Sequence, residues 1–186
     1  TSTFSQGQFD LLTIPSLKSA LADKSVLTSI NHDQEQIIAV GERGHILSWS
    51  DEENWQQQNV PVSSTLTDVT RLKDGTRFAV GHDSVILKSE PKSDTWSKVF
   101  DGNELTRLKI TFIQKKIETL RNELDGLSDE EEIEELEFNI EELEFNLEDA
   151  EVELEDGPNK PLLSITSSDT KQLFAVGAYG TLLTSA

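Results

Sequence analysis

The feature of this sequence that most constrains its fold is a tripeptide, Ala-Val-Gly, that occurs three times in matching surroundings. The copies begin at Ala39, Ala79 and Ala175. A Leu and a β-branched residue precede each copy, and a Leu and a Ser follow it. The first two copies start 40 residues apart, and the third starts 96 residues after the second. Such spacing indicates one supersecondary unit per repeat, with an insertion of about 56 residues before the third.

Each of the first two repeats contains four short apolar or β-branched runs separated by turn residues, which is the pattern of short β-strands. The expected strands are 27–30, 36–40, 45–47 and 56–60, then 66–72, 76–80, 85–88 and 96–100. Gly41 and Gly44 bound a short connection, which predicts a tight hairpin with positive φ angles at its centre. Four antiparallel strands per repeat predict one blade of a β-propeller.

The insertion, residues 104–157, has a different composition from the repeats. It holds 20 of the 35 Asp and Glu residues but only 5 of the 16 Lys and Arg residues, so it carries −15 of the net charge of −19. Apolar residues recur at alternating intervals of three and four from Ile110 to Leu127 and from Ile133 to Leu154. This spacing predicts two helices with a heptad seam. Because their connection is short, they should form an antiparallel coiled-coil hairpin.

The ends of the two helices also have sequence signals. Gly126 is expected to end the first helix in a left-handed conformation. Ser128, followed three residues later by Glu131, predicts a capping box at the start of the second helix.

A nearly duplicated heptad in the second helix indicates a candidate binding surface. The segments 134–140 (EELEFNI) and 141–147 (EELEFNL) place Phe138 and Phe145 at one repeated position, opposite the seam. Phe112 in the first helix also lies off its seam and is expected near the level of Phe145, close to the base of the hairpin. Two interpretations are open: this face packs on the β-sheets, or it binds a protein partner or a second copy of the chain. In the second case the neighbouring carboxylates would select a basic rim; the predicted site is Phe112, Glu137, Phe138, Glu141, Glu144 and Phe145.

The repeats resemble the BNR or Asp-box type of propeller blade, and specifically the photosystem II assembly factor-like family. The segments that carry the resemblance are 39–47 (AVGERGHIL), 79–87 (AVGHDSVIL) and 175–180 (AVGAYG). They are similar to bacterial relatives that accompany RND-type exporters, over about residues 15–102 and 161–186. The Asp box itself departs from the family pattern, because Ser50 to Trp55 is shortened and Asp94 stands where Gly is usual. The resemblance implies a non-enzymatic scaffold or assembly factor that binds proteins in the cell envelope, with an RND-type exporter as one implied partner.

Residues suited to catalysis or to binding a cofactor do not form a recognisable pattern. A sialidase, an enzyme built on Asp-box propellers, requires a cluster of arginines and a tyrosine nucleophile, whereas this chain has one tyrosine, Tyr179, and scattered arginines. Cysteine is absent, and His32, His45 and His82 occupy non-equivalent positions in the repeats without metal-ligand spacing. We therefore expect no enzymatic activity, no cofactor and no metal. The acidic charge argues against nucleic acid or an anionic membrane surface as partner, and no apolar run approaches the ~18 residues of a membrane span.

These observations predict a mainly β fold with an α insertion: two whole four-stranded blades, the start of a third, and the helical hairpin. The expected segments are a lead-in at 1–26, blades at 27–64 and 65–103, the hairpin at 104–157 and a partial blade at 158–186. The lead-in is expected to be either a strand that closes a blade or an unstructured terminus.

The favoured function is protein binding as a scaffold. A carbohydrate- or small-ligand-binding propeller fragment and a degenerate sialidase-like glycosidase are alternatives. The start at Thr1 fits either a removed signal peptide or a trimmed sequence. A periplasmic or otherwise exported location is expected, with a cytoplasmic one left open. Because two and a half blades cannot close a ring, we expect the chain to be the N-terminal portion of a longer protein or to pair its open edges with another chain.

Overall fold

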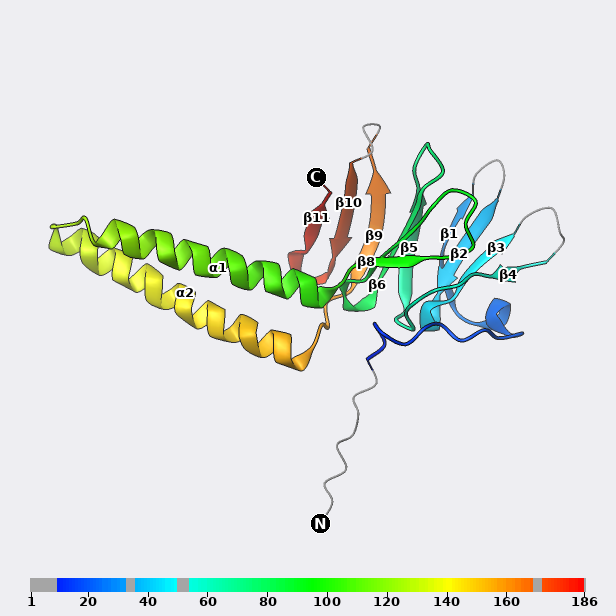
Figure 1. The fold of residues 1–186 in the computed structure, drawn as a ribbon, viewed down its shortest axis with the longest axis horizontal. Coiled ribbons are helices and arrows are strands. Elements are labelled where there is room, and N and C mark those ends of the chain that lie inside the picture. The colour runs from blue at the N-terminus through cyan, green and yellow to red at the C-terminus, as the bar shows by residue number, and fades with distance from the viewer. Residues whose placement is uncertain (1–9, 33–35, 50–53, 169–171, 186) are drawn as a thin grey trace, which may run out of the picture. The chain divides into compact units, whose positions relative to one another are not determined.

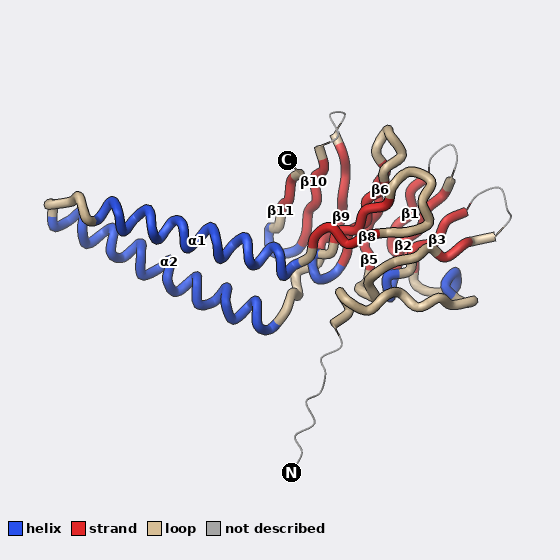
Figure 2. Tube along the Cα trace, viewed as in Figure 1, coloured by secondary structure: helices blue, strands red, loops and turns tan. Residues whose placement is uncertain are grey.

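The computed structural model describes residues 10–32, 36–49, 54–168 and 172–185. The chain divides into two compact units, one formed by residues 1–101 and 159–186 and the other by residues 102–158. The described part contains three antiparallel β-sheets of four, four and three strands, and two α-helices (Figures 1 and 2). The fold is thus mainly β with a helical insertion.

The three sheets follow the three sequence repeats. The first contains β1 (Leu27–His32), β2 (Ile37–Gly41), β3 (Ile46–Trp49) and β4 (Gln56–Gln57). The second contains β5 (Leu66–Arg71), β6 (Arg77–Gly81), β7 (Ile86–Ser89) and β8 (Ser97–Phe100). The third contains β9 (Leu162–Ser167), β10 (Leu173–Gly177) and β11 (Leu182–Thr184). In each sheet every strand pairs with its neighbour in sequence.

Strand β4 is shorter than the expected 56–60 because the last hydrogen bond to β3 is donated by the Gln58 N–H, to the Ile46 carbonyl, and the chain then turns towards the second repeat. The Asn59 N–H donates to the carbonyl of Asp94, and the Asn59 carbonyl accepts from the Trp96 N–H. These residues therefore connect the first repeat to the second instead of extending β4.

The structure explains why Ala-Val-Gly recurs. The three Ala side chains are buried, and those of Val40 and Val80 are fully buried. A Cβ atom at Gly41 would lie 2.1 Å from the Val26 carbonyl oxygen, and one at Gly81 would lie 2.2 Å from that of Thr65. In both sheets the first strand has an irregular register opposite this Gly. Glycine is required there because the two backbones approach too closely for any side chain.

The connection that follows each Ala-Val-Gly is a single 3₁₀ turn with positive φ, as the sequence predicts. The three turns are η2 (Glu42–Gly44), η3 (His82–Ser84) and η4 (Ala178–Gly180). The positive φ angles fall on the second and third residues of each turn, including Arg43, Asp83 and Tyr179.

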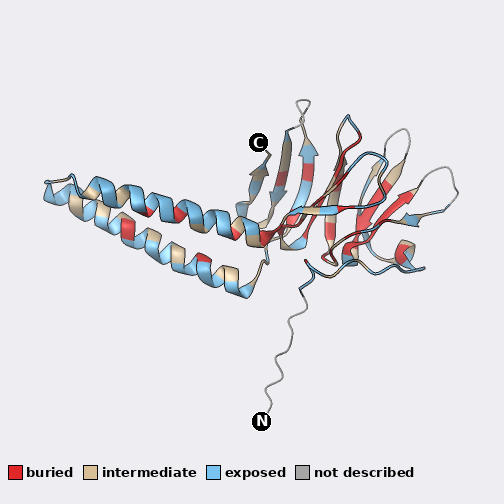
Figure 3. Ribbon diagram, viewed as in Figure 1, coloured by how far each residue is buried: buried red, intermediate tan, exposed pale blue. Residues whose placement is uncertain are grey.

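Each sheet packs face to face on the next through apolar side chains (Figure 3). Between the first and second sheets lie Ile38, Val40 and Ile46 on one side and Leu66, Val69, Ala79 and Leu87 on the other. Between the second and third sheets lie Phe78, Val80 and Ile86 on one side and Leu162, Ile165 and Ala175 on the other. Successive residues of β6, such as Ala79 and Val80, therefore face opposite neighbours, as expected for a strand buried on both faces.

Asp68 in β5 links all three sheets. Its Oδ1 atom accepts from Ser29 Oγ of the first sheet at 2.7 Å, and its Oδ2 atom accepts from Ser164 Oγ at 2.7 Å and from the Ile165 N–H at 2.9 Å in the third. Its own sheet supplies the Val69 N–H, at 2.9 Å from Oδ1. Burial opposes ionisation of this carboxyl, but the hydrogen bonds outweigh burial and lower the pKa of Asp68 below its ordinary value.

The lead-in takes neither expected form over residues 10–26, since these residues form no strand and yet pack on the first two repeats. Leu12 is buried in the core between the first two sheets. The Ser16 N–H donates to the Val60 carbonyl at 3.0 Å, and the Ser63 N–H donates to the Leu11 carbonyl at 2.8 Å. These backbone bonds go to the loop between β4 and β5 rather than to a strand edge, so the segment remains irregular apart from the 3₁₀ turn η1 (Ala22–Lys24).

Replacing Asp68 by Asn should destabilise the compact unit that contains the three sheets, residues 1–101 and 159–186, which we call the β unit. Each carboxylate oxygen accepts from a backbone N–H, so an amide NH₂ in either orientation would face a donor. We expect the free energy of unfolding to fall by about 1.5–3 kcal/mol, the range for hydrogen bonds to a charged group. Urea unfolding followed by tryptophan fluorescence measures it, because Trp49, Trp55 and Trp96 all lie in the β unit. Asp23→Asn is the control, because the partly exposed Asp23 carboxylate is ion-paired with the adjacent Lys24, and it should change the free energy of unfolding by less than about 1 kcal/mol.

The Asp68→Asn effect should also depend on pH. Because the folded-state pKa is lowered, the native state binds fewer protons than the unfolded state near that pKa. The stabilisation is therefore fully present above the ordinary value of 3.8 and is lost as the pH falls through the lowered folded-state value. The difference between wild type and Asp68→Asn should narrow in that acidic range. An unchanged difference would show that the carboxylate charge is not what stabilises the sheets.

Candidate functional site

The candidate site lies on the helical hairpin, which contains α1 (Gly102–Leu124) and α2 (Glu130–Asp156). Ile113, Ile117 and Ile140 are buried between the two helices. Leu120, Leu124, Leu143 and Leu147 pack against them. These are the residues of the predicted heptad seam, so the hairpin has a hydrophobic core of its own.

Both helix-end predictions are wrong in detail. The N-cap of α2 is Asp129 rather than Ser128: its Oδ1 accepts from the N–H groups of Glu131 and Glu132 at 3.1 and 3.2 Å. Gly126 does not adopt a positive φ, because its N–H donates to the Glu123 carbonyl in a tight turn that continues α1. The positive φ in this unit occurs instead at Gly157, which follows α2.

Two ion pairs join the helices. Lys109 Nζ lies 3.5 Å from Glu153 Oε2, and the Arg121 guanidinium pairs with the Glu144 carboxylate. Both pairs are partly exposed, so each contributes at most about 1 kcal/mol. Glu144, which the sequence placed in the partner-binding site, is therefore engaged with α1 of its own hairpin.

A row of apolar side chains lies on the opposite side of α2 from the seam. Phe138, Phe145 and Val152 follow each other at intervals of seven residues and are 67%, 64% and 52% exposed. We call these three residues the outer stripe. Val152 was not among the predicted site residues, although it occupies the same heptad position one repeat further on. The outward direction of the two phenylalanines agrees with the heptad assignment.

Phe112 is also exposed, at 68%, together with Leu108 one turn earlier on α1. The ion pairs Lys109–Glu153 and Arg121–Glu144 set the register of the two helices and place Phe112 level with the region of Val152 on α2. Phe145 lies about six residues, or ~10 Å at ~1.5 Å per residue, further from the start of α1. The prediction that the two side chains share a level close to the base of the hairpin is therefore wrong, because it did not include the register of the helices.

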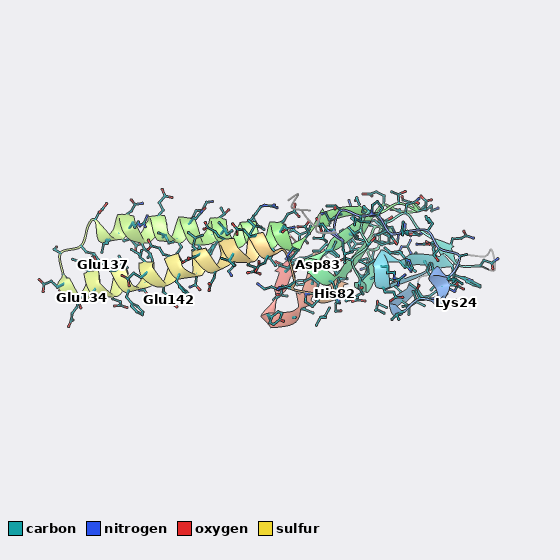
Figure 4. The ribbon with its side chains drawn as sticks, turned by 90° about the horizontal axis from the view of Figure 1, so that it is seen from below. Lys24, His82, Asp83, Glu134, Glu137 and Glu142 are labelled. Atoms are coloured by element: carbon teal, nitrogen blue, oxygen red, sulfur yellow. The ribbon has the colours of Figure 1, made fainter. Side chains whose placement is uncertain are left out.

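The outer stripe lies in a strongly acidic environment. Helix α2 contains 15 Asp and Glu residues and no Lys or Arg, whereas α1 contains 5 Lys and Arg and 3 Glu. Glu134, Glu137 and Glu142 are marked along α2 in Figure 4. The like charges on one helix repel each other, so this surface favours a partner of opposite sign.

The predicted glutamates differ in their positions relative to the phenylalanines. Glu141 lies three residues after Phe138 and four before Phe145, so it is beside both rings on the helix surface. Glu142 has the complementary spacing and was missed by the sequence analysis, although the same heptad rule identifies it. Glu137 and Glu144 each immediately precede a phenylalanine, about 100° around the helix from its ring. Glu141 and Glu142 are therefore the carboxylates that flank the outer stripe.

Groups that could support metal or acid–base chemistry are sparse in the described residues. No group of three or more His, Asp or Glu side chains there is placed to hold a metal ion. His45 is buried, and burial lowers its pKa, which favours the neutral form of the ring. Nor does any described helix combine the length and apolar character that crossing a membrane requires.

Compared with protein-family models, with curated proteins and with solved structures, the chain shows no match.

Substitution at the two candidate caps should separate their roles. Asp129→Ala removes the acceptor for two backbone N–H groups and should destabilise the hairpin by about 0.5–2 kcal/mol. Ser128→Ala is the matched control and should leave stability unchanged. Thermal loss of helicity in the full chain, followed by far-ultraviolet circular dichroism, measures both. Equal effects of the two substitutions would contradict the assignment of Asp129 as the cap.

Proposed function

We propose that the chain is a non-enzymatic scaffold that binds a protein partner through the outer stripe of α2. The partner surface that fits is an amphipathic helix with apolar residues at heptad spacing and Lys or Arg beside them. The observation that carries this proposal is the exposure of Phe138 and Phe145 on the face away from the seam. The hairpin core does not need these two residues, because the seam is already filled by other side chains.

The energetics favour a partner that supplies both apolar surface and positive charge. Burying one phenylalanine contributes ~1.5–3 kcal/mol, so two contribute ~3–6 kcal/mol, compared with the ~8 kcal/mol of a micromolar interaction, before binding costs are subtracted. Glu141 and Glu142 lie beside both rings, where they can pair with cations at the rim. Such rim charges mainly raise the association rate and reject acidic competitors.

A second part of the proposal concerns the fold of the β unit. We propose that the three sheets are consecutive blades of a propeller, because the same strand positions make the same sheet-to-sheet contacts twice in succession. The resemblance to photosystem II assembly factor-like proteins is the basis for placing this scaffold in the cell envelope. The proposed association of this scaffold with an RND-type exporter rests on the same resemblance.

A designed peptide tests the docking surface directly. The probe is a helical peptide with Leu at heptad spacing and Lys at the flanking positions, and its control has Glu in place of every Lys. We expect the full-length chain to bind the basic peptide and not the acidic one. Binding should weaken as salt is added, because the Debye length falls from ~10 Å at 0.1 M to ~3 Å at 1 M. Isothermal titration calorimetry gives the dissociation constants.

The decisive variant is Phe138→Ala/Phe145→Ala. It should weaken binding of the basic peptide by at least about tenfold, equivalent to ~1.4 kcal/mol, with no change in thermal stability. Phe112→Ala is the matched control, since it removes an equally exposed ring from α1. Unchanged binding by the double variant would exclude the outer stripe as the docking surface. A marked loss of stability with binding intact would instead assign the two rings to intramolecular packing.

A further inference from the structure

The two outermost sheets of the β unit each expose a face that is buried elsewhere in the same unit. Figure 1 shows the second sheet between the other two, so within the described residues the first and third sheets each have a neighbouring sheet on one side only. On the outer face of the first sheet the side chains of Ala39 and its cross-strand partner Leu47 are nevertheless buried, so the exposed part of that face is the β1 side around Ile30. The repeats allow each exposed residue to be compared with its buried equivalents. We call the outer faces of the first and third sheets the open faces. The comparison identifies which kind of sheet surface would cover each of them.

On the third sheet, the open face contains the residues that receive the following sheet in the first two repeats. Val40 in β2 is paired with Ile46, and Val80 in β6 is paired with Ile86. Both valines are fully buried against the next sheet. The equivalent pair in the third sheet is Val176 and Leu182. Val176 is 46% exposed and Leu182 is 62% exposed.

On the first sheet, the open face contains the residues that insert into the preceding sheet in the other two repeats. Val69, paired with Ala79, is buried against the first sheet. Ile165, paired with Ala175, is buried against the second sheet. The equivalent residue in the first sheet is Ile30, which is paired with Ala39 and is 64% exposed. The two open faces are therefore the two halves of a contact that the chain already makes twice.

The 3₁₀ turn and the first strand of each sheet can be compared in the same way, by the hydrogen bonds that they donate to the next sheet. Ser84 in η3 donates from both its N–H and its Oγ to the Lys160 carbonyl, just before the third sheet. The equivalent Gly180 in η4 has no atom within 4 Å of its Cβ position. In the first strands, Thr28 Oγ1 donates to the Leu66 carbonyl and Thr67 Oγ1 to the Leu162 carbonyl, both at 2.6 Å.

The third sheet differs at this last position. Its equivalent residue is Leu163, which has no hydroxyl group and is 53% exposed. The hydrogen bond of the first two contacts is thus replaced by additional apolar surface beside Val176 and Leu182. This change makes the open face more hydrophobic than its buried counterparts, which is typical of a surface that is covered by another chain.

From this repetition we infer that the open face of the third sheet binds the first sheet of a second copy of this chain, head to tail. The contact would place Ile30 of one copy against Val176 and Leu182 of the other, as Val69 lies against Val40 and Ile46 within the chain. Such a contact joins two different surfaces, so copies joined in this way close into a ring or extend into a chain. This inference rests on the sheet contacts alone and is independent of the outer stripe on α2.

The test compares two variants that each remove one half of the contact. Ile30→Glu and Val176→Glu both place a carboxylate at an exposed position, so each chain should fold. Analytical ultracentrifugation of the wild type should show concentration-dependent association, and each variant alone should remain monomeric up to about 1 mM. The control is Val99→Glu in β8, because Val99 has the same 46% exposure as Val176 and lies outside both open faces. It should associate like the wild type.

Mixing the two variants gives the outcome that is specific to a head-to-tail contact. Ile30→Glu retains an intact third sheet and Val176→Glu retains an intact first sheet, so an equimolar mixture should form a one-to-one heterodimer and nothing larger. A mixture that stays monomeric although the wild type associates would overturn the head-to-tail arrangement. A wild-type chain that is monomeric up to about 1 mM would overturn the proposal as a whole and leave the open face to a different occupant.

Discussion

Packing of one sheet on the next is the interaction on which the β unit depends. Each sheet is narrow, with at most four strands, and cannot bury its apolar residues alone. The second sheet resolves this by facing both neighbours, with Ala79 and Leu87 directed to one side and Val80 to the other. Its carboxylate at Asp68 adds hydrogen bonds to both neighbours. Stability in this unit therefore comes from contacts between repeats rather than from any single repeat.

The helical hairpin obeys a different constraint. Its seam is satisfied by its own isoleucines and leucines, and its net charge comes almost entirely from α2. A hairpin built only for stability would not place two phenylalanines among like charges on its solvent face. Phe138 and Phe145 add nothing to the seam. They give α2 an exposed apolar surface among its acidic side chains. That combination suits recognition of a basic amphipathic surface.

The order of the strands, the turns with positive φ and the heptad seam could all be predicted from the sequence, since each depends on interactions within a few residues. The choice of Asp129 over Ser128 as the cap could not, because it depends on where the first turn of α2 begins. The lead-in was also mispredicted: Leu12 is apolar and Pro15 favours extended backbone, yet the hydrogen-bond partners of this segment lie in the loop after β4. In the candidate site, the exposure of Phe138 and Phe145 followed from the heptad position. The pairing of Glu144 with Arg121 depended on the register of the two helices.

By itself, the sequence determined the repeat, the interruption and the two kinds of periodicity, because apolar spacing dictates which backbone geometry can bury a face. It also determined the need for glycine after each Ala-Val pair, through the recurrence of that residue. Only the tertiary structure decided which equivalent residues are covered. Val40, Val80 and Val176 are the same residue in the same local sequence, but the first two are buried and the third is exposed. The difference lies in whether a following sheet is found among the described residues, which no local pattern encodes.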